Sequence, residues 1–231
     1  MYKKTLQAAL GLSIALLGTA AYAETLTGTY VNYTFDESAL GMFGTAALSA
    51  SGDGLVFSPV DFMATTSGTV FAQDTIYVTV TANPGYQLTA FGLSETGRYS
   101  RSGDGPLGVT GQFGLTDVEG TTVNHILATI EASPGSFTEE SGSWAAQAAI
   151  TLPATGWGGA DGSVGSVSLE ISNLLDTSGF SGSASIYKDF IGLSAFTTTV
   201  SPVPEANTYA MMLAGLGLVG FMARRRINAS A

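Results

Sequence analysis

The chain has no cysteine and a single histidine, His125, among its 231 residues. Without thiols it forms no disulfide, no thiolate zinc site, no iron–sulfur cluster and no cysteine nucleophile. One imidazole also excludes most histidine-rich metal sites. Charged residues are scarce, at 11% against about 25% in ordinary soluble domains. The 45% of hydrophobic residues nevertheless excludes a disordered acidic tail, which would be poor in apolar side chains.

The first 23 residues have the three parts of a secretory signal peptide. A pair of lysines forms the basic start, residues 6–20 form an apolar run, and Ala21 and Ala23 fit an A-x-A cleavage site. As a helix the apolar run would be about 22 Å long, which is short for a membrane span and suits a signal core. An uncleaved N-terminal anchor is the alternative. We predict export, with Glu24 as the first residue of the mature protein.

A second signal, over residues 202–231, combines a proline–glutamate motif at 203–206, an uncharged apolar stretch at 208–223 and a basic tail at 224–226. Sixteen residues make about 24 Å of helix, slightly thin against a hydrocarbon core of about 30 Å, so we predict a weak or temporary transmembrane helix. Arginines stay on the cytoplasmic side, which places the rest of the chain outside. A buried C-terminal helix would leave the arginines unexplained. The residues expected to carry the signal are Val203, Pro204, Glu205, Arg224, Arg225 and Arg226.

This three-part arrangement resembles the PEP-CTERM sorting signal of Gram-negative bacteria, and the stretch from Tyr209 to Arg226 is very close to that signal's helix and tail. The resemblance implies that the inner membrane anchors the precursor transiently and that an exosortase-like membrane enzyme processes it. It also implies a place at the cell surface or in the extracellular matrix, in association with exopolysaccharide and biofilm. One departure is Ala206, where the family has a second proline that would favour extended backbone.

The 178 residues from Glu24 to Ser201 are enough for one domain with a sizeable core. They contain 3 basic and 17 acidic residues, which gives this region a formal charge of −14. Such a field repels nucleic acid and anionic membrane surfaces. We therefore expect no nucleic-acid partner.

Alternating apolar positions predict strands throughout residues 24–201. Apolar and polar residues alternate in 75–82 and 167–171, and Trp144 opens an apolar face in 144–152. Clusters of Gly, Pro, Asn and Ser separate the segments. About nine short strands favour an all-β fold, an antiparallel β-sandwich of which a jelly roll is one form. The remaining predicted strands are 25–35, 87–93, 111–116, 124–132, 183–188 and 196–200.

Three internal segments carry a fainter resemblance. Residues 83–99, 171–175 and 184–190 are similar to segments common in one group of PEP-CTERM proteins. That group has no established activity, so the resemblance implies a shared fold and no chemistry.

The sequence contains few candidates for catalytic residues. His125 is the one imidazole base for a serine hydrolase, no G-x-S-x-G elbow occurs, and alternation places His125 on an exposed or edge strand. A glycosidase needs only paired carboxylates. Its candidates are Asp117, Glu119, Glu139 and Glu140. Acidic residues in such loops are usually solvated, so we expect a non-enzymatic, structural or adhesive protein, with a secreted hydrolase as the second alternative.

A carbohydrate-binding module is the first alternative. Trp157 lies in a glycine-rich loop, where an exposed indole could stack on a sugar ring of a matrix polysaccharide. Tyr86 and Tyr99 lie near turns and could act in the same way. The competing interpretation is that Trp144 and Trp157 fill the core of the sandwich.

No cofactor or metal site is expected, with structural calcium assembled from several loops as an alternative. Asp53, Asp104 and Asp161 each precede a glycine in turn sequence, and none has the D-x-D-x-D-G spacing of a calcium loop. Asp-Gly is foremost a turn pair, because both residues tolerate positive φ. The sequence therefore assigns no ligands.

Overall fold

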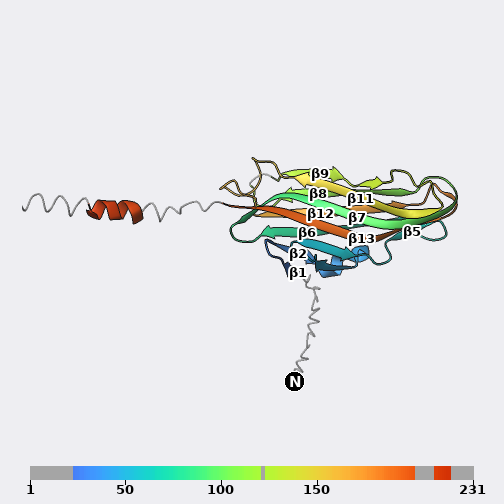
Figure 1. Ribbon diagram of the computed structural model, residues 1–231, viewed down its shortest axis with the longest axis horizontal. Helices are drawn as coiled ribbons and strands as arrows, with labels where there is room; N and C mark the ends of the chain where they lie inside the picture. Colours follow the sequence, from blue (N-terminus) through green and yellow to red (C-terminus); the bar gives the residue numbers. More distant parts are fainter. Residues whose placement is uncertain (1–22, 121–122, 201–210, 220–231) are drawn as a thin grey trace, which may run out of the picture.

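Two antiparallel β-sheets stack on each other in the computed structural model, which describes residues 23–120, 123–200 and 211–219 (Figure 1). The all-β antiparallel sandwich expected from the sequence is confirmed. Sheet A contains, in spatial order, β1 (Ala23–Thr27), β2 (Val31–Asp36), β6 (Phe71–Ala82), β12 (Ser166–Asp176), β8 (Gly108–Asp117) and β9 (His125–Thr129).

Sheet B provides the second layer and contains the two longest strands. Its spatial order is β10 (Glu131–Ser133), β11 (Ser141–Thr151), β7 (Tyr86–Asp104), β13 (Ser181–Thr199), β4 (Gly54–Ser58) and β3 (Thr45–Leu48). The short β5 (Met63–Thr65) also pairs with β13. Two 3-10 helices, Glu37–Ala39 and Gly41–Phe43, lie between β2 and β3.

The core lies between the inner faces of the sheets. Along β12, buried and half-buried residues alternate from end to end, as a strand with one face in the core requires. The buried apolar residues of both sheets form a single cluster. Each fully buried Val, Leu, Ile or Phe side chain stabilises the fold by about 1.5–3 kcal/mol. The largest buried side chains of the core include Tyr33, Phe57, Phe91, Phe113 and Trp144.

Two predictions about the direction of side chains match the structure. In β11 the residues buried on one side begin with Trp144 and continue at every second position to Ile150. β9 is the edge strand of sheet A, and His125 is exposed on it. Both predictions rested on the alternation of side chains across a strand.

Two segments predicted as single strands are each divided. Residues 25–35 form the hairpin of β1 and β2, because the Gly28 N–H donates to the Val31 carbonyl at 2.9 Å and closes a tight turn. Residues 124–132 change sheets: β9 pairs with β8, and β10 pairs with β11. Ile130 lies between the two strands and is buried. A run of strand-forming residues carries no mark of such a crossing.

Other predicted strands are parts of longer ones. Residues 183–188 and 196–200 fall largely within the continuous β13, which pairs with β7 through the intervening Gly192 and Ser194. Residues 87–93 are part of β7. The structure also contains β3, β4 and β5, which the sequence did not predict.

A bulge in β13 follows Lys188, whose side chain is buried in the core. The register with β7 shifts between Lys188 and Phe190. Asp189 is exposed at the bulge, and its carboxylate pairs with Arg98 on the outer face at 2.6 Å. Lys188 and Ile191 both point inward, which regular alternation would not allow. Bulges commonly redirect a side chain in this way.

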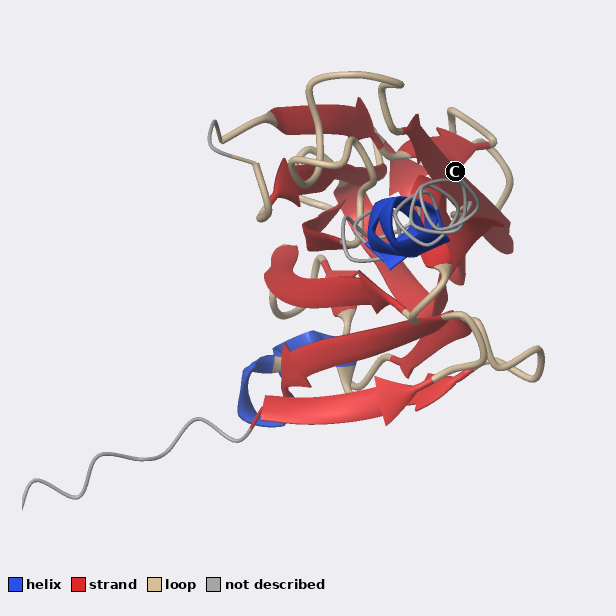
Figure 2. Cartoon of the chain, turned by 90° about the vertical axis from the view of Figure 1, so that its left-hand side faces the viewer, coloured by secondary structure: helices blue, strands red, loops and turns tan. Residues whose placement is uncertain are grey.

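The predicted terminal signals lie mainly outside the described residues. Of the signal peptide, Ala23 is described, and it begins β1, whereas Ala21 is not. Residues 211–219, inside the predicted transmembrane helix 208–223, form an exposed helix beyond one end of the sandwich, and Figure 2 views the molecule from that end. No helix within the described ranges is long and apolar enough to span a membrane. The motif at 203–206 and the basic tail lie outside them.

Candidate functional site

A cluster of polar side chains lies in the core between the two sheets. Glu95 on β7 and Lys188 on β13 belong to sheet B, and Asn173 on β12 belongs to sheet A. The side chains of Glu95 and Lys188 have 0% exposed surface, and Asn173 is 1% exposed. Lysine and glutamate are almost never fully buried unless they are paired. The cluster is therefore the most unusual chemical feature of the described residues.

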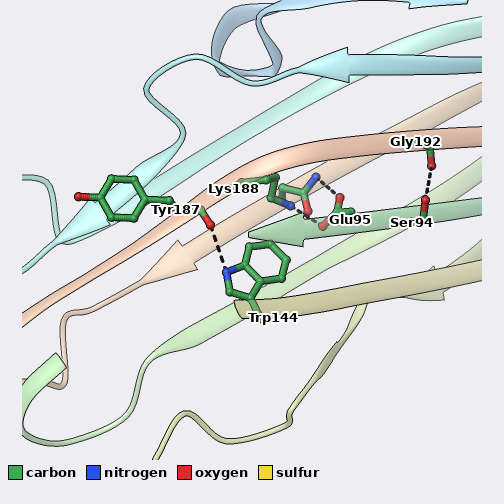
Figure 3. A network of polar contacts seen from close by, with 7 residues as sticks. Ser94, Glu95, Trp144, Tyr187, Lys188 and Gly192 are labelled. Atoms are coloured by element: carbon green, nitrogen blue, oxygen red, sulfur yellow. Dashed lines mark hydrogen bonds and ion pairs between the residues drawn. The ribbon is translucent and has the colours of Figure 1, made fainter. Parts of the chain in front are cut away.

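One carboxylate joins the three side chains. The Lys188 Nζ donates to Glu95 Oε2, so the two form a buried ion pair (Figure 3). The Asn173 Nδ2 donates to Glu95 Oε1 at 2.8 Å. Asn173 Oδ1 is buried and has no hydrogen-bond partner among the described residues. The amine and the carboxamide thus approach the same carboxylate from opposite sheets.

Two aromatic rings enclose the amine. The Nζ of Lys188 lies 5.3 Å from the ring centroid of Phe62 and 5.5 Å from that of Trp144, within the range of cation–π attraction. The Trp144 Nε1 donates to the Tyr187 carbonyl at 3.1 Å (Figure 3). Gly97 makes room for the indole, because a Cβ there would overlap the Trp144 ring and the Tyr187 carbonyl. Trp144 is a core residue, as the competing interpretation of the sequence held.

The surroundings change the acidity of the amine. Burial lowers the pKa of Lys188, and the nearby carboxylate of Glu95 opposes this effect. Lys188 therefore gives up its proton more readily than an exposed lysine does. A buried amine with a carboxylate and a carboxamide in reach has the components of acyl-transfer chemistry.

Trp157, the predicted glycan contact, is not exposed. Trp157 is 8% exposed and belongs to the hydrophobic core cluster. The loop is held down by Asp117, whose Oδ2 accepts from the Gly158 N–H at 3.0 Å. The Asp117 Oδ1 accepts from the N–H groups of Glu119 at 3.0 Å and Gly120 at 3.1 Å. Asp117, a predicted carboxylate candidate, therefore anchors two loops.

Asp117 gives the fold an expected sensitivity to acid. Burial alone would raise the pKa of Asp117, but the N–H groups of Glu119, Gly158 and Gly120 and the Asn124 side chain hold it below its usual value. The native state then binds fewer protons than the unfolded state as pH falls. The stabilisation is complete above the ordinary aspartate pKa of about 3.9 and is lost as pH decreases through the lower folded pKa.

We expect Asp117→Asn to lower the free energy of unfolding at neutral pH by about 1.5–3 kcal/mol and to flatten its decline in acid. The amide nitrogen of asparagine would face an N–H donor that the carboxylate now accepts. Denaturant unfolding at several pH values measures both effects. Asp104→Asn, at an exposed position of β7, is the matched control and should change neither quantity much. Equal acid sensitivity in Asp117→Asn and the wild type would contradict this account.

The two tyrosines proposed to accompany Trp157 also pack against other rings. Tyr99 is 5% exposed, and its ring centroid lies 4.8 Å from that of Phe137. Tyr86 is half-buried, 4.9 Å from the ring centroid of Tyr30. With Trp157 buried, the three aromatic residues do not form one exposed platform.

Among the described residues, no contact brings His125 together with the candidate carboxylates of a hydrolase. His125 Nδ1 lies 2.9 Å from the hydroxyl of Thr116. Glu139 and Glu140 are exposed. Glu119 Oε2 accepts from the Gly165 N–H at 2.6 Å, a loop contact. The catalytic roles considered for these residues stay predictions.

Two of the three aspartates that precede a glycine, Asp53 and Asp161, accept a hydrogen bond from a backbone N–H group. Asp53 Oδ1 accepts from the Tyr30 N–H at 2.8 Å, and Asp161 Oδ1 accepts from the Ser163 N–H at 3.0 Å. Asp104 lies at the end of β7. Within the described ranges no three His, Asp or Glu residues are grouped so that they could hold a metal ion. The described residues therefore provide no set of ligands for the structural calcium considered from the sequence.

Comparison with known proteins bears on the end of the chain. A family model of the PEP-CTERM protein-sorting motif matches residues 202–226, which include the proline–glutamate motif and the basic tail. Among curated proteins no relative of the chain is recognisable. The match confirms the resemblance seen in the sequence. The motif implies an exported, membrane-anchored precursor that an exosortase-type membrane enzyme processes.

Proposed function

We propose, from the PEP-CTERM protein-sorting motif at residues 202–226, that this chain is a structural or adhesive protein of the cell surface or extracellular matrix of a Gram-negative bacterium. Its role there is non-enzymatic and associated with exopolysaccharide and biofilm. The motif is the single observation that carries the proposal.

The proposed route has three steps. The signal peptide directs the chain into the export pathway and is removed near Ala23. The apolar stretch 208–223 then holds the precursor in the inner membrane, with the arginines on the cytoplasmic side. An exosortase-type enzyme recognises Pro204, Glu205 and the basic tail and releases the sandwich domain outside.

The sandwich supports a structural role. Its buried charged groups bond to one another, to Asn173 or to the backbone: Glu95 to Lys188 and Asn173, and Asp117 to loop N–H groups. These contacts stabilise the fold and leave no carboxylate of this set facing a cleft. The formal charge of −14 over residues 24–201 also keeps the exported domain away from anionic lipid surfaces.

Neutralising the basic tail tests the sorting step. We expect replacement of Arg224, Arg225 and Arg226 by glutamine to reduce mature protein at the surface and in the medium several-fold, because the anchor loses the charges that fix its orientation. Mass spectrometry of the membrane, surface and medium fractions locates both termini of each species. Arg98→Gln is the control, since it removes an arginine of the domain and leaves the tail intact. Unchanged mature protein in the tail variant would contradict a role of the arginines in sorting.

A further inference from the structure

We infer that the buried cluster is a self-modification site, at which the Lys188 side chain forms an isopeptide bond to the Asn173 side chain with Glu95 as the acid–base group. The bond would join β13 of sheet B to β12 of sheet A through the core. This inference goes beyond the proposed function and does not depend on it.

The first support is the arrangement of the three groups. The amine of Lys188 and the carboxamide of Asn173 are hydrogen-bonded to the two oxygens of one carboxylate, that of Glu95. This arrangement holds nucleophile and electrophile at a shared acid–base group before any reaction. Such positioning replaces an encounter in solution and lowers the barrier to reaction.

The second support is the exclusion of water. Glu95 and Lys188 have no exposed side-chain surface, and Asn173 is 1% exposed. The rings of Phe62 and Trp144 cover the amine. Hydrolysis cannot compete in such a site, and burial also lowers the pKa of Lys188, which favours the neutral amine that attacks.

The third support is the unpartnered Asn173 Oδ1. Nearly all buried side-chain oxygens in native proteins accept a hydrogen bond, and one that does not calls for an explanation. As the carbonyl oxygen of the electrophile it is the atom on which negative charge develops during attack. Glu95 contacts the nitrogen of the same carboxamide, so its carboxyl proton is within reach of the leaving group.

The reaction balances without any co-reactant. Glu95 takes a proton from the Lys188 ammonium, and the neutral Nζ attacks Cγ of Asn173 to form a C–N bond. The tetrahedral intermediate breaks the bond from Cγ to Nδ2, and Glu95 returns its proton to the departing nitrogen. This nitrogen thus leaves as ammonia, and the proton that Nζ loses on becoming an amide converts the ammonia to ammonium. No group is oxidised or reduced.

The isopeptide bond would provide a covalent cross-link in a chain that cannot form a disulfide. The chain has no cysteine, so no disulfide can hold its sheets together. An amide between β12 and β13 needs no oxidant and is not reversed by thiols. It would connect a central strand of sheet B with a central strand of sheet A.

Peptide mapping of the purified, folded protein tests the inference directly. An endoproteinase that cleaves before aspartate releases residues 161–175, which contain Asn173, and residues 176–188, which contain Lys188. We expect one branched peptide whose mass is the sum of the two minus one ammonia. We also expect trypsin not to cleave after Lys188. Two separate peptides with a free Lys188 would overturn the inference.

Three variants test the separate roles of Lys188, Glu95 and Asn173 in forming the bond. Lys188→Arg removes the nucleophile and Glu95→Gln removes the proton carrier, so both should yield two separate peptides. Asn173→Asp should yield the same linked product as the wild type, because water leaves in place of ammonia. A link that persists in Glu95→Gln would overturn the role of Glu95. If these variants fail to fold, the wild-type map alone decides whether the bond exists.

Discussion

Replacing Lys188 with methionine is expected to lower the free energy of unfolding by about 3–5 kcal/mol, because a buried charge is left without its partner. Glu95 has no exposed side-chain surface, and its remaining hydrogen bond comes from the neutral amide of Asn173. Neither water nor another cation can compensate for the missing ammonium. In a protein that carries the isopeptide bond, Lys188 Nζ is an amide nitrogen and no longer an ammonium, so the substitution there removes the covalent link instead of the ion pair. Denaturant unfolding of the mature protein measures the change.

The double variant Glu95→Leu with Lys188→Met is the matched control. It removes both charges and keeps apolar bulk, and replacing a whole buried ion pair by apolar residues is often neutral or stabilising. We therefore expect it to be more stable than Lys188→Met alone. The difference between the double change and the two single changes gives the coupling energy. A double variant as unstable as Lys188→Met would show that lost packing, and not the unpaired carboxylate, explains the effect.

The class of the fold could be predicted because it depends on a local property. Side chains alternate across a strand, so the apolar face of residues 144–152 identified the inner face of β11 before any partner strand was known. The exposed position of His125 followed from the same rule. Where the chain changes sheets at Ile130, local alternation carries no information, because strand-forming residues continue through the crossing.

The buried cluster left a weaker trace in the sequence, which our prediction did not use. Glu95 continues the alternation of Phe91 and Leu93, and Lys188 continues that of Ala184 and Ile186. Each is thus a charged residue at an inward position. The meeting with Asn173 depends on the stacking of one sheet on the other, which no local pattern encodes. The burial of Trp157 has a similar origin, because Asp117 holds its loop from 41 residues away.

Trp144→Ala is expected to destabilise the domain by about 3–5 kcal/mol, the usual cost of deleting a large aromatic side chain from a core. The residue is 2% exposed, and its Nε1 satisfies the Tyr187 carbonyl next to Lys188. The substitution leaves a cavity that Gly97, which has no side chain, cannot fill. It also uncovers one side of the Lys188 ammonium. Thermal and denaturant unfolding followed by far-ultraviolet circular dichroism measure the loss without relying on tryptophan fluorescence.

Trp144→Phe separates the contribution of the aromatic ring to stability from that of the indole N–H. It keeps an aromatic ring beside the Lys188 amine and removes the N–H, so we expect a smaller cost of about 1–3 kcal/mol, mainly from the Tyr187 carbonyl left unpaired. The same variant bears on the isopeptide bond, because a ring still excludes water from the cluster. Trp144→Phe should therefore keep the branched peptide, whereas the hydrated cavity of Trp144→Ala should reduce it. Equal stability of the two variants would mean that the ring contributes nothing to the packing around Lys188.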